Sequence, residues 1–338
     1  MNKFPVIIFL LISVFYNTNM LVYAEQTNTV GIKGNYLYVN FVDRKLNQIF
    51  FQYDLYTKTN KILLKKEITE YPTATYSKSN NEVYFTYKTK NKTSQLFKKN
   101  LNNSQTAQLT NEFNHVDLLE LDEKNQLLIM RVLMSGSDRN FQFAIYDLKN
   151  KEIHKWDNQD KDTSVKMINY NPDKEQLLVV TNSVKKEYEK IDQANKKGIP
   201  PEPPVYTLSI YNKDGQKVKD ITSLETFLTG ASLSSDGKDV LISYFNNLEE
   251  QIYNVATIDM ESQNKTLLLQ DSKISMREPE YSKDKSGFYF LANKNKQIEI
   301  NDKNDNTVTV NFYDLREKSI TEIWSQVDGA VVNFFVGK

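Results

Sequence analysis

A hairpin-like phrase recurs six times along this chain of 338 residues and predicts an all-β fold, a six-bladed β-propeller of four-stranded blades. Two further observations support this fold class. A second phrase, a polar turn followed by an apolar strand, precedes each copy of the first. Aromatic residues make up 12% of the chain, with 20 Tyr and 18 Phe, a bias that favours half-buried strands over helices.

The first phrase is an apolar or aromatic pair, then Asp or Asn, then a polar turn with Lys and a second apolar run. This order predicts a β-hairpin, because the Asp or Asn ends one strand and the polar residues turn the chain. The six copies are centred on Asp54, Asn100, Asp147, Asn212, Asp259 and Asp314. Successive copies lie 46, 47, 65, 47 and 55 residues apart.

The second phrase is a Ser/Asn/Asp/Gly turn followed by an apolar strand of five or six residues. It is clearest at 233–245 and 281–292, looser at 75–87, 120–132 and 169–181, and most divergent at 31–42. Two hairpins in each repeat give four strands, and four-stranded units of about 40–50 residues are typical of propeller blades.

Residues 185–204 interrupt the fourth repeat and account for its long step, because removing these 20 residues from 65 leaves 45. Lys185 to Lys197 is charged and compatible with a helix, which Gly198 and Pro200 are expected to end. A smaller insertion at 293–307 lengthens the last step.

One strand, Val331 to Val336, follows the sixth repeat without a partner of its own. We expect it to pair beside the N-terminal repeat and so close the ring, which removes a free sheet edge. A seventh, incomplete blade is the alternative.

The phrases PEYSKD at 279–284 and LSSDGK at 233–238 resemble the WD-like repeat of TolB-like propellers. The resemblance covers most of the chain after the N-terminal segment, although neither phrase has the family's Pro before Asp. It implies the fold and a role as an interaction scaffold. It implies no reaction, since similar propellers also serve as lids on peptidases.

Residues 1–24 have the pattern of a secretory signal peptide. Lys3 precedes an apolar run at 4–16, and Ala24 ends a segment with small residues at the positions that a signal peptidase recognises. We therefore expect cleavage near Ala24, a secreted or extracytoplasmic location, and a single propeller domain at 25–338 with no membrane span. An uncleaved N-terminal anchor is the alternative.

Composition excludes several classes of function. The 43 basic and 43 acidic residues balance, so no nucleic-acid partner is expected. There is no Cys and there are only two His, which excludes thiolate chemistry, Cys-ligated metals and sites with three His ligands. We expect no cofactor, and we expect a monomer.

Five residues are candidates for a ligand or partner face. His115 and Asp117 are expected in a polar connection, 111–117, that leads into the third repeat. Arg277 and Glu278 are expected in the equivalent connection before the sixth repeat, and Tyr71 in the one before the second. Because such connections gather at one end of a propeller's central channel, these side chains could ring its opening.

Asp302, Asn304 and Asn306 have the spacing of the first three ligands of a calcium loop. Thr307 stands where the loop needs Gly, and Tyr313 where it needs Glu, so we expect a polar turn and no metal.

No nucleophile elbow and no paired metal-binding His motif is present in the sequence. We therefore favour a non-enzymatic, extracytoplasmic binding or scaffold propeller that recognises a protein, a peptide or an envelope component. The alternative is an exported enzyme that cleaves carbohydrate or peptide at the channel mouth.

Overall fold

The computed structural model describes residues 35–68, 71–136, 139–156, 160–300 and 303–337, without the side chains of 294–306. The predicted signal peptide at 1–24 and its cleavage site lie outside the described residues. The described residues all belong to one compact unit.

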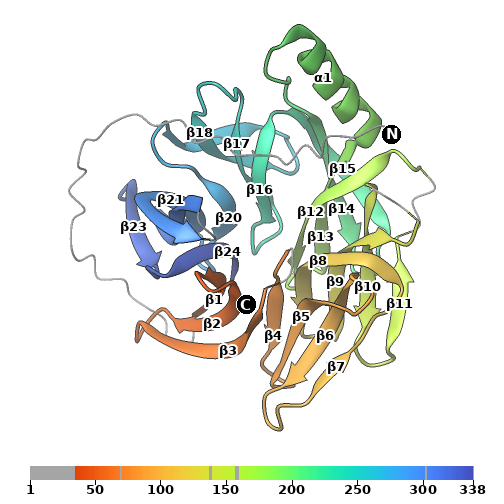
Figure 1. Cartoon of the computed structure of the whole chain (residues 1–338). Coiled ribbons are helices and arrows are strands. Elements are labelled where there is room, and N and C mark those ends of the chain that lie inside the picture. The colour runs from red at the N-terminus through yellow and green to blue at the C-terminus, as the bar shows by residue number, and fades with distance from the viewer. Residues whose placement is uncertain (1–34, 69–70, 137–138, 157–159, 301–302, 338) are drawn as a thin grey trace. The chain divides into compact units, whose positions relative to one another are not determined.

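Six four-stranded antiparallel sheets form the blades, as the sequence predicts (Figure 1). From the inner to the outer strand, the first three blades are β24 (Gly329–Val336), β1 (Tyr36–Asp43), β2 (Asn47–Asp54) and β3 (Thr59–Glu67); β4 (Ala74–Ser77), β5 (Glu82–Lys88), β6 (Ser94–Asn100) and β7 (Thr106–Gln108); and β8 (Phe113–Asp122), β9 (Leu127–Met134), β10 (Phe141–Asp147) and β11 (Glu152–Lys155). The other three are β12 (Thr163–Asn171), β13 (Gln176–Ser183), β14 (Val205–Asn212) and β15 (Lys217–Glu225); β16 (Phe227–Leu233), β17 (Asp239–Phe245), β18 (Tyr253–Asp259) and β19 (Lys265–Asp271); and β20 (Arg277–Tyr281), β21 (Gly287–Ile300), β22 (Lys303–Asp314) and β23 (Ser319–Trp324).

The C-terminal strand β24 closes the ring by pairing with β1, with Leu37 opposite Val336 and Asp43 opposite Gly329. The first blade thus takes its inner strand from the end of the chain. In the other blades, the turn of the second phrase joins the inner strand to the next strand. In the first blade no inner strand precedes β1 in the sequence, which explains why the N-terminal copy of the phrase is the most divergent. The count of six blades is confirmed, and the alternative of seven is excluded.

The repeated Asp or Asn shapes the turn after the third strand of each blade. In the first copy Asp54 Oδ1 accepts hydrogen bonds from the backbone N–H groups of Tyr56 and Thr57, at 2.8 and 2.9 Å. Lys58 then has a φ of 54°, in the left-handed region. Equivalent bonds are made by Asn100, Asp147, Asn212, Asp259 and Asp314. The phrase therefore recurs because a short polar side chain must satisfy the turn's amides.

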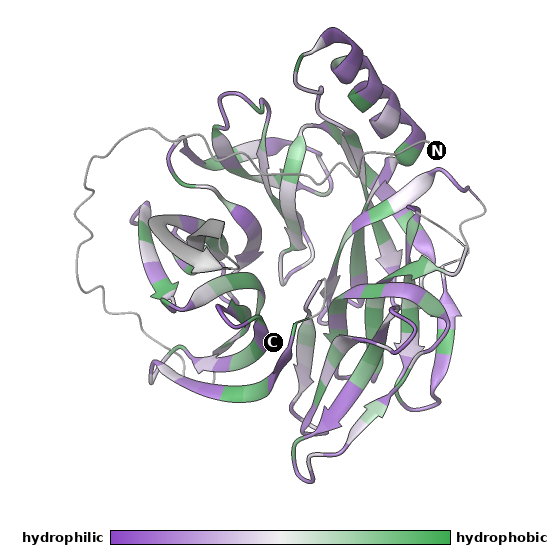
Figure 2. Cartoon of the chain, viewed as in Figure 1, coloured by the Kyte–Doolittle hydropathy of each residue, from purple (hydrophilic) through white to green (hydrophobic). Residues whose placement is uncertain are grey.

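The core lies between blades and not at a single centre. In the layer between the third and fourth blades, Phe143 packs edge-to-face on Tyr211 at 5.4 Å between ring centroids and stacks on Trp156 at 5.1 Å. Val165 and Leu177 of the fourth blade complete this layer and are fully buried. Apolar residues lie along the strands of all blades (Figure 2), because each sheet buries both faces against its neighbours.

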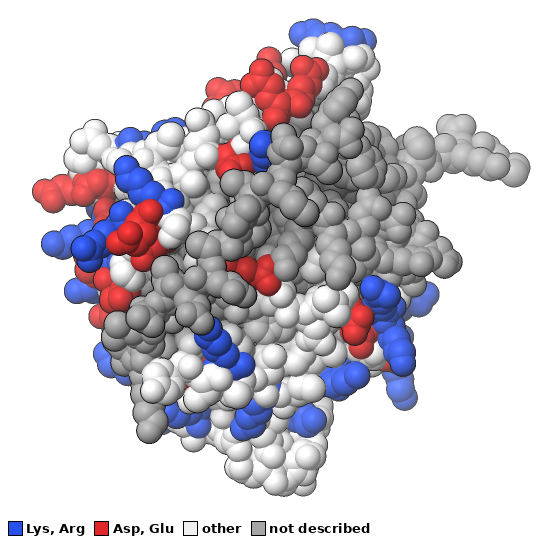
Figure 3. All heavy atoms as spheres, turned by 90° about the vertical axis from the view of Figure 1, so that its left-hand side faces the viewer, with Lys and Arg blue, Asp and Glu red and all other residues white. Residues whose placement is uncertain are grey.

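The two ends of the blades form two different faces. We call connection face the one that carries the links from each outer strand to the next inner strand: β3–β4, β7–β8, β11–β12, β15–β16, β19–β20 and β23–β24. We call hairpin face the opposite one, which carries the Asp and Asn turns described above. On the side drawn in Figure 3, basic and acidic side chains are intermixed, in keeping with their equal numbers.

Candidate functional site

All five candidate residues lie at the connection face, where the inner strands begin. Tyr71 lies in the β3–β4 connection, as predicted, and 60% of its surface is exposed. His115 and Asp117 differ from the prediction, because β8 already begins at Phe113 and both residues belong to this inner strand. Arg277 and Glu278 likewise begin the inner strand β20 and are not in a connection.

His115 and Asp117 form a pair because residues two apart on a strand point to the same side. His115 Nε2 lies 3.2 Å from Asp117 Oδ2, and both side chains are buried. A backbone irregularity follows at once, since Leu118 has a φ of 45° and the pairing of β8 with β9 shifts between Asp117 and Leu119. Such bulges bend an inner strand and redirect its side chains.

Arg131 of β9 holds the Asp117 carboxylate with two hydrogen bonds of 2.7 Å, from Nε and from Nη2. Burial alone would raise the pKa of Asp117, but the hydrogen bonds from Arg131 and His115 outweigh it and lower the pKa below its usual range. Asp117 is therefore a permanent anion near neutral pH, neutralised by a bidentate partner.

Aromatic rings surround this buried pair. The Tyr71 ring meets the His115 ring edge-on at 5.1 Å between centroids, and Phe141 does so at 6.1 Å. The Arg131 guanidinium lies over the Phe141 ring at 4.6 Å. We call this group the His115 cluster; its members are Tyr71, His115, Asp117, Arg131 and Phe141. In it, the exposed Tyr71 ring packs on His115, which contacts the buried Asp117–Arg131 ion pair. This combination suits recognition, since aromatic rings and Arg are enriched where proteins bind partners.

Glu278 lies in a second group, on the sixth blade, and the structure does not join it to the His115 cluster. Its φ is 49°, and the pairing of β20 with β21 shifts between Arg277 and Glu280. A Cβ on Gly230 would lie 2.5 Å from the Glu278 backbone nitrogen, so only glycine fits at that point of the fifth blade. Burial raises the pKa of Glu278 to about 7, against the lowering effect of Arg277.

The insertion at 185–204 forms helix α1 (Val184–Lys197), which Ser183 caps at the start and Gly198, with a φ of 65°, at the end. It connects β13 to β14 (Figure 1) and therefore lies at the connection face, as the candidate residues do. Lys166 of β12 pairs with Glu187 of α1 at 3.0 Å and accepts a hydrogen bond from Arg131 on its backbone oxygen at 2.6 Å. The helix and the His115 cluster thus both contact Lys166 of the fourth blade.

The calcium-like spacing does not form a described site. Asp302 lies outside the described residues, and Asn304 and Asn306 belong to the ladder of β22, opposite Glu299 and Gln297. The ladder of β21 and β22 extends to Ile300 opposite Lys303, so most of the expected polar turn is strand, and residues 301–302 lie outside the described residues. Over the described residues, the His, Asp and Glu side chains form no group of three that could hold a metal ion.

Sequence reasoning missed Arg131 and Phe141, which lie in strands that look ordinary in the repeat. Arg131 interrupts the apolar run of residues 127–134, and a charge inside such a run was the one available indication. Its partner could not be found from sequence, because the pairing register of β8 with β9 depends on two irregularities.

Comparisons with known proteins agree with this architecture. No family model matches the chain. The uncharacterized protein YdjN of Bacillus subtilis strain 168 is 26% identical over 314 residues, which cover 90% of this chain and 87% of YdjN. The crystal structure of TolB from Acinetobacter baumannii has a TM-score of 0.61 at 13% identity, covering 89% of this chain and 66% of that one.

The chain is a six-bladed propeller similar in structure to TolB. A chain of a nidogen/laminin complex is also similar, with a TM-score of 0.59 at 9% identity, covering 90% of this chain and 98% of that one. Likeness at this level of identity establishes the fold alone. In the part that the structure describes, no helix is both long and apolar enough to span a membrane.

Proposed function

We propose that this chain is an exported, non-enzymatic propeller that binds a protein, a peptide or an envelope component through its connection face. The observation that carries the proposal is Tyr71, a 60% exposed aromatic ring supported by His115 and the buried Asp117–Arg131 pair. An exposed ring fixed by its neighbours loses little conformational freedom on binding, which favours such residues as anchors.

Other exposed apolar side chains occur on the same face. Ile199 and Val205 flank the end of the α1 insertion, with 53% and 43% exposed, and Val327 in the β23–β24 connection has 55% exposed. A partner seated there would cover them together with Tyr71. One of the similar propellers was solved in a complex of nidogen and laminin, which supports a binding role for this architecture.

Affinity capture tests the proposal. Purified residues 25–338 are immobilised and exposed to cross-linked envelope extract from the source organism, and the recovered species are identified by mass spectrometry. We expect one saturable species that Tyr71→Ala weakens about tenfold or more, the effect of removing an anchor residue. The matched control is Tyr56→Ala, because Tyr56 is also 60% exposed but lies in a turn of the hairpin face. Equal capture by the two variants would exclude Tyr71 as the anchor.

One observation favours the alternative of an exported hydrolase. Glu278 has a pKa raised to about 7, the range of a general acid. If the chain cleaves glycans or peptides through this carboxyl group, Glu278→Gln abolishes turnover of a polysaccharide or peptide library. Turnover that survives this substitution argues against the alternative, and so does a purified wild-type protein without activity.

A further inference from the structure

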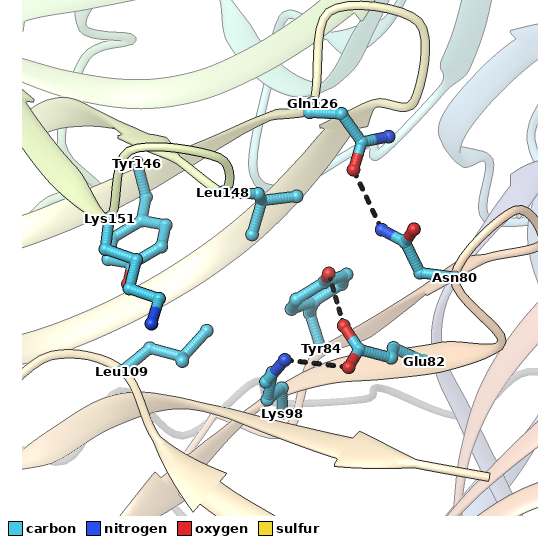
Figure 4. Close-up of a pocket in the computed structure, with 9 residues that line it drawn as sticks. All are labelled: Asn80, Glu82, Tyr84, Lys98, Leu109, Gln126, Tyr146, Leu148 and Lys151. Atoms are coloured by element: carbon cyan, nitrogen blue, oxygen red, sulfur yellow. Dashed lines mark hydrogen bonds and ion pairs between the residues drawn. The ribbon is translucent and has the colours of Figure 1, made fainter. Parts of the chain in front are cut away.

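A pocket of about 350 Å³ opens on the hairpin face between the second and third blades, away from the connection face (Figure 4). This volume is at the lower end of the range of small-molecule sites. The second blade contributes Glu82, Tyr84 and Lys98, and the third contributes Tyr146 and Lys151. The proposed function makes no use of this pocket.

The floor of the pocket is a closed hydrogen-bonded network. The buried Glu82 carboxylate accepts from Lys98 Nζ at 2.7 Å and from the Tyr84 hydroxyl at 2.8 Å. Burial alone would raise the pKa of Glu82, but these two hydrogen bonds outweigh it and lower the pKa. Burial and the neighbouring Glu82 raise the pKa of Tyr84, so its hydroxyl stays a donor. Glu82 is therefore neutralised from within the protein and is not available to attract a cation.

Two further donors at the pocket, the Lys151 ammonium and the Tyr146 hydroxyl, make no hydrogen bond or ion pair with any residue in the described ranges. Figure 4 shows the Lys98 ammonium directed at the Glu82 carboxylate and the Lys151 ammonium on the side of the pocket that the third blade forms. The repeated turn that starts at Asp147 sets the backbone of Lys151, which has a φ of 60°, and the exposed Lys151 side chain extends from this turn along the pocket.

The charges in the pocket leave an excess of one positive charge, because two lysines face one glutamate. Leu109 and Leu148 add apolar surface to the lining. Unpaired donors and one excess positive charge beside an apolar wall are complementary to an anion with an apolar body.

We propose that this pocket binds a small organic monocarboxylate, with its carboxylate between Lys98 and Lys151 and its body against Leu109 and Leu148. The carboxylate would take the free protons of both ammonium groups and of the Tyr146 hydroxyl. An uncharged molecule of the same shape would fill the volume without pairing with the ammonium groups. The pocket should therefore prefer a carboxylate over its uncharged analogue.

Ligand-observed NMR titration with benzoate and with butyrate tests the proposal, with benzamide and butyramide as uncharged molecules of matching shape. Residues 25–338 are used as wild type, as Lys151→Gln and as Lys149→Gln. Lys149 is an exposed lysine of the same turn that does not line the pocket, so it controls for net charge. Lys98→Gln is avoided because it would leave the buried Glu82 carboxylate without its cationic partner.

We expect saturable binding of at least one carboxylate in the millimolar range or tighter, with its amide at least about tenfold weaker. Lys151→Gln should weaken carboxylate binding about tenfold, whereas Lys149→Gln should leave it within about twofold of wild type. Three results would overturn the proposal: no saturable binding of either carboxylate, equal binding of acid and amide, or equal effects of the two lysine substitutions.

Discussion

Arg131 and Lys166 connect two neighbouring blades: the guanidinium that binds Asp117 on the third blade also donates to the Lys166 backbone oxygen on the fourth, at 2.6 Å. The buried pair therefore supports more than the ring of Tyr71. It links the His115 cluster to the strand on which α1 is anchored through Lys166 and Glu187.

Replacing Arg131 with Met should lower the free energy of unfolding by about 3–5 kcal/mol, because it leaves the Asp117 carboxylate buried without its main partner. The Asp117 side chain is only 4% exposed, so water cannot replace the lost bonds. Urea denaturation measures the change. Arg316→Met is the control, since the Arg316 side chain is 93% exposed. Similar losses in the two variants would contradict a structural role for the pair.

Gly230→Ala should destabilise the fold by about 1–3 kcal/mol, because the added Cβ would overlap the Glu278 backbone, which cannot move as a side-chain tip can. Gly136→Ala serves as the comparison, because a Cβ there meets nothing within 4 Å and only its φ of 82° is unfavourable. Thermal unfolding of the two variants compares the cost of the overlap at Gly230 with the cost of the unfavourable φ at Gly136. A Gly230 variant no less stable than the Gly136 variant would show that Glu278 does not approach this closely.

The pH dependence of stability should carry the signature of Glu278. Its pKa is about 7 in the fold against an ordinary 4.5, so the folded state binds more protons than the unfolded state between these values. Stability should therefore fall as pH rises from about 4.5 to 7, by at most about 3 kcal/mol from this group, and then level off.

Glu278→Gln should remove that fall and be more stable than wild type at pH 8 but not at pH 4.5, as measured by urea denaturation at both values. Glu261→Gln is a matched control on an exposed turn. Parallel pH profiles of wild type and Glu278→Gln would mean that this carboxyl group titrates normally.

Removal of β24 should abolish the cooperative unfolding transition. A chain that ends at Asp328 loses the buried side chains of Val331, Phe334 and Val336 and leaves the inner edge of the first blade unpaired. Calorimetry and dye binding report the loss. A chain that ends at Gly337 keeps all of β24 and should unfold like wild type. A cooperative transition in the shorter chain would show that closure by β24 is dispensable.

Export predicts a mature N-terminus at Glu25. Intact-mass measurement of protein recovered from the source organism's envelope and medium tests this, and Ala24→Phe should block cleavage by replacing the small residue that signal peptidase requires. Recovery of the uncleaved chain from wild type would favour the N-terminal anchor.

The sequence alone was sufficient for the fold class, the blade count with one alternative and the closing strand. These follow from local rules: Asp54 and its five counterparts must satisfy turn amides, and apolar runs must alternate with turns. The helix expected for Lys185 to Lys197 also followed from local sequence, a charged segment before Gly198 and Pro200, and α1 ends at Lys197 with Gly198 as its cap.

Only the tertiary structure decided which residues meet. The proximity of Tyr71 to His115 depends on the packing of the second blade against the third, and Arg131 reaches Asp117 because irregular pairing sets the register of β8 on β9. The pocket likewise joins Lys98 of strand β6 to Lys151 of a turn on the next blade. The repeated phrases predict how each blade folds, because turns and strands depend on short stretches of local sequence. Contacts between blades are unique to each pair of side chains, so no repeated pattern can predict them.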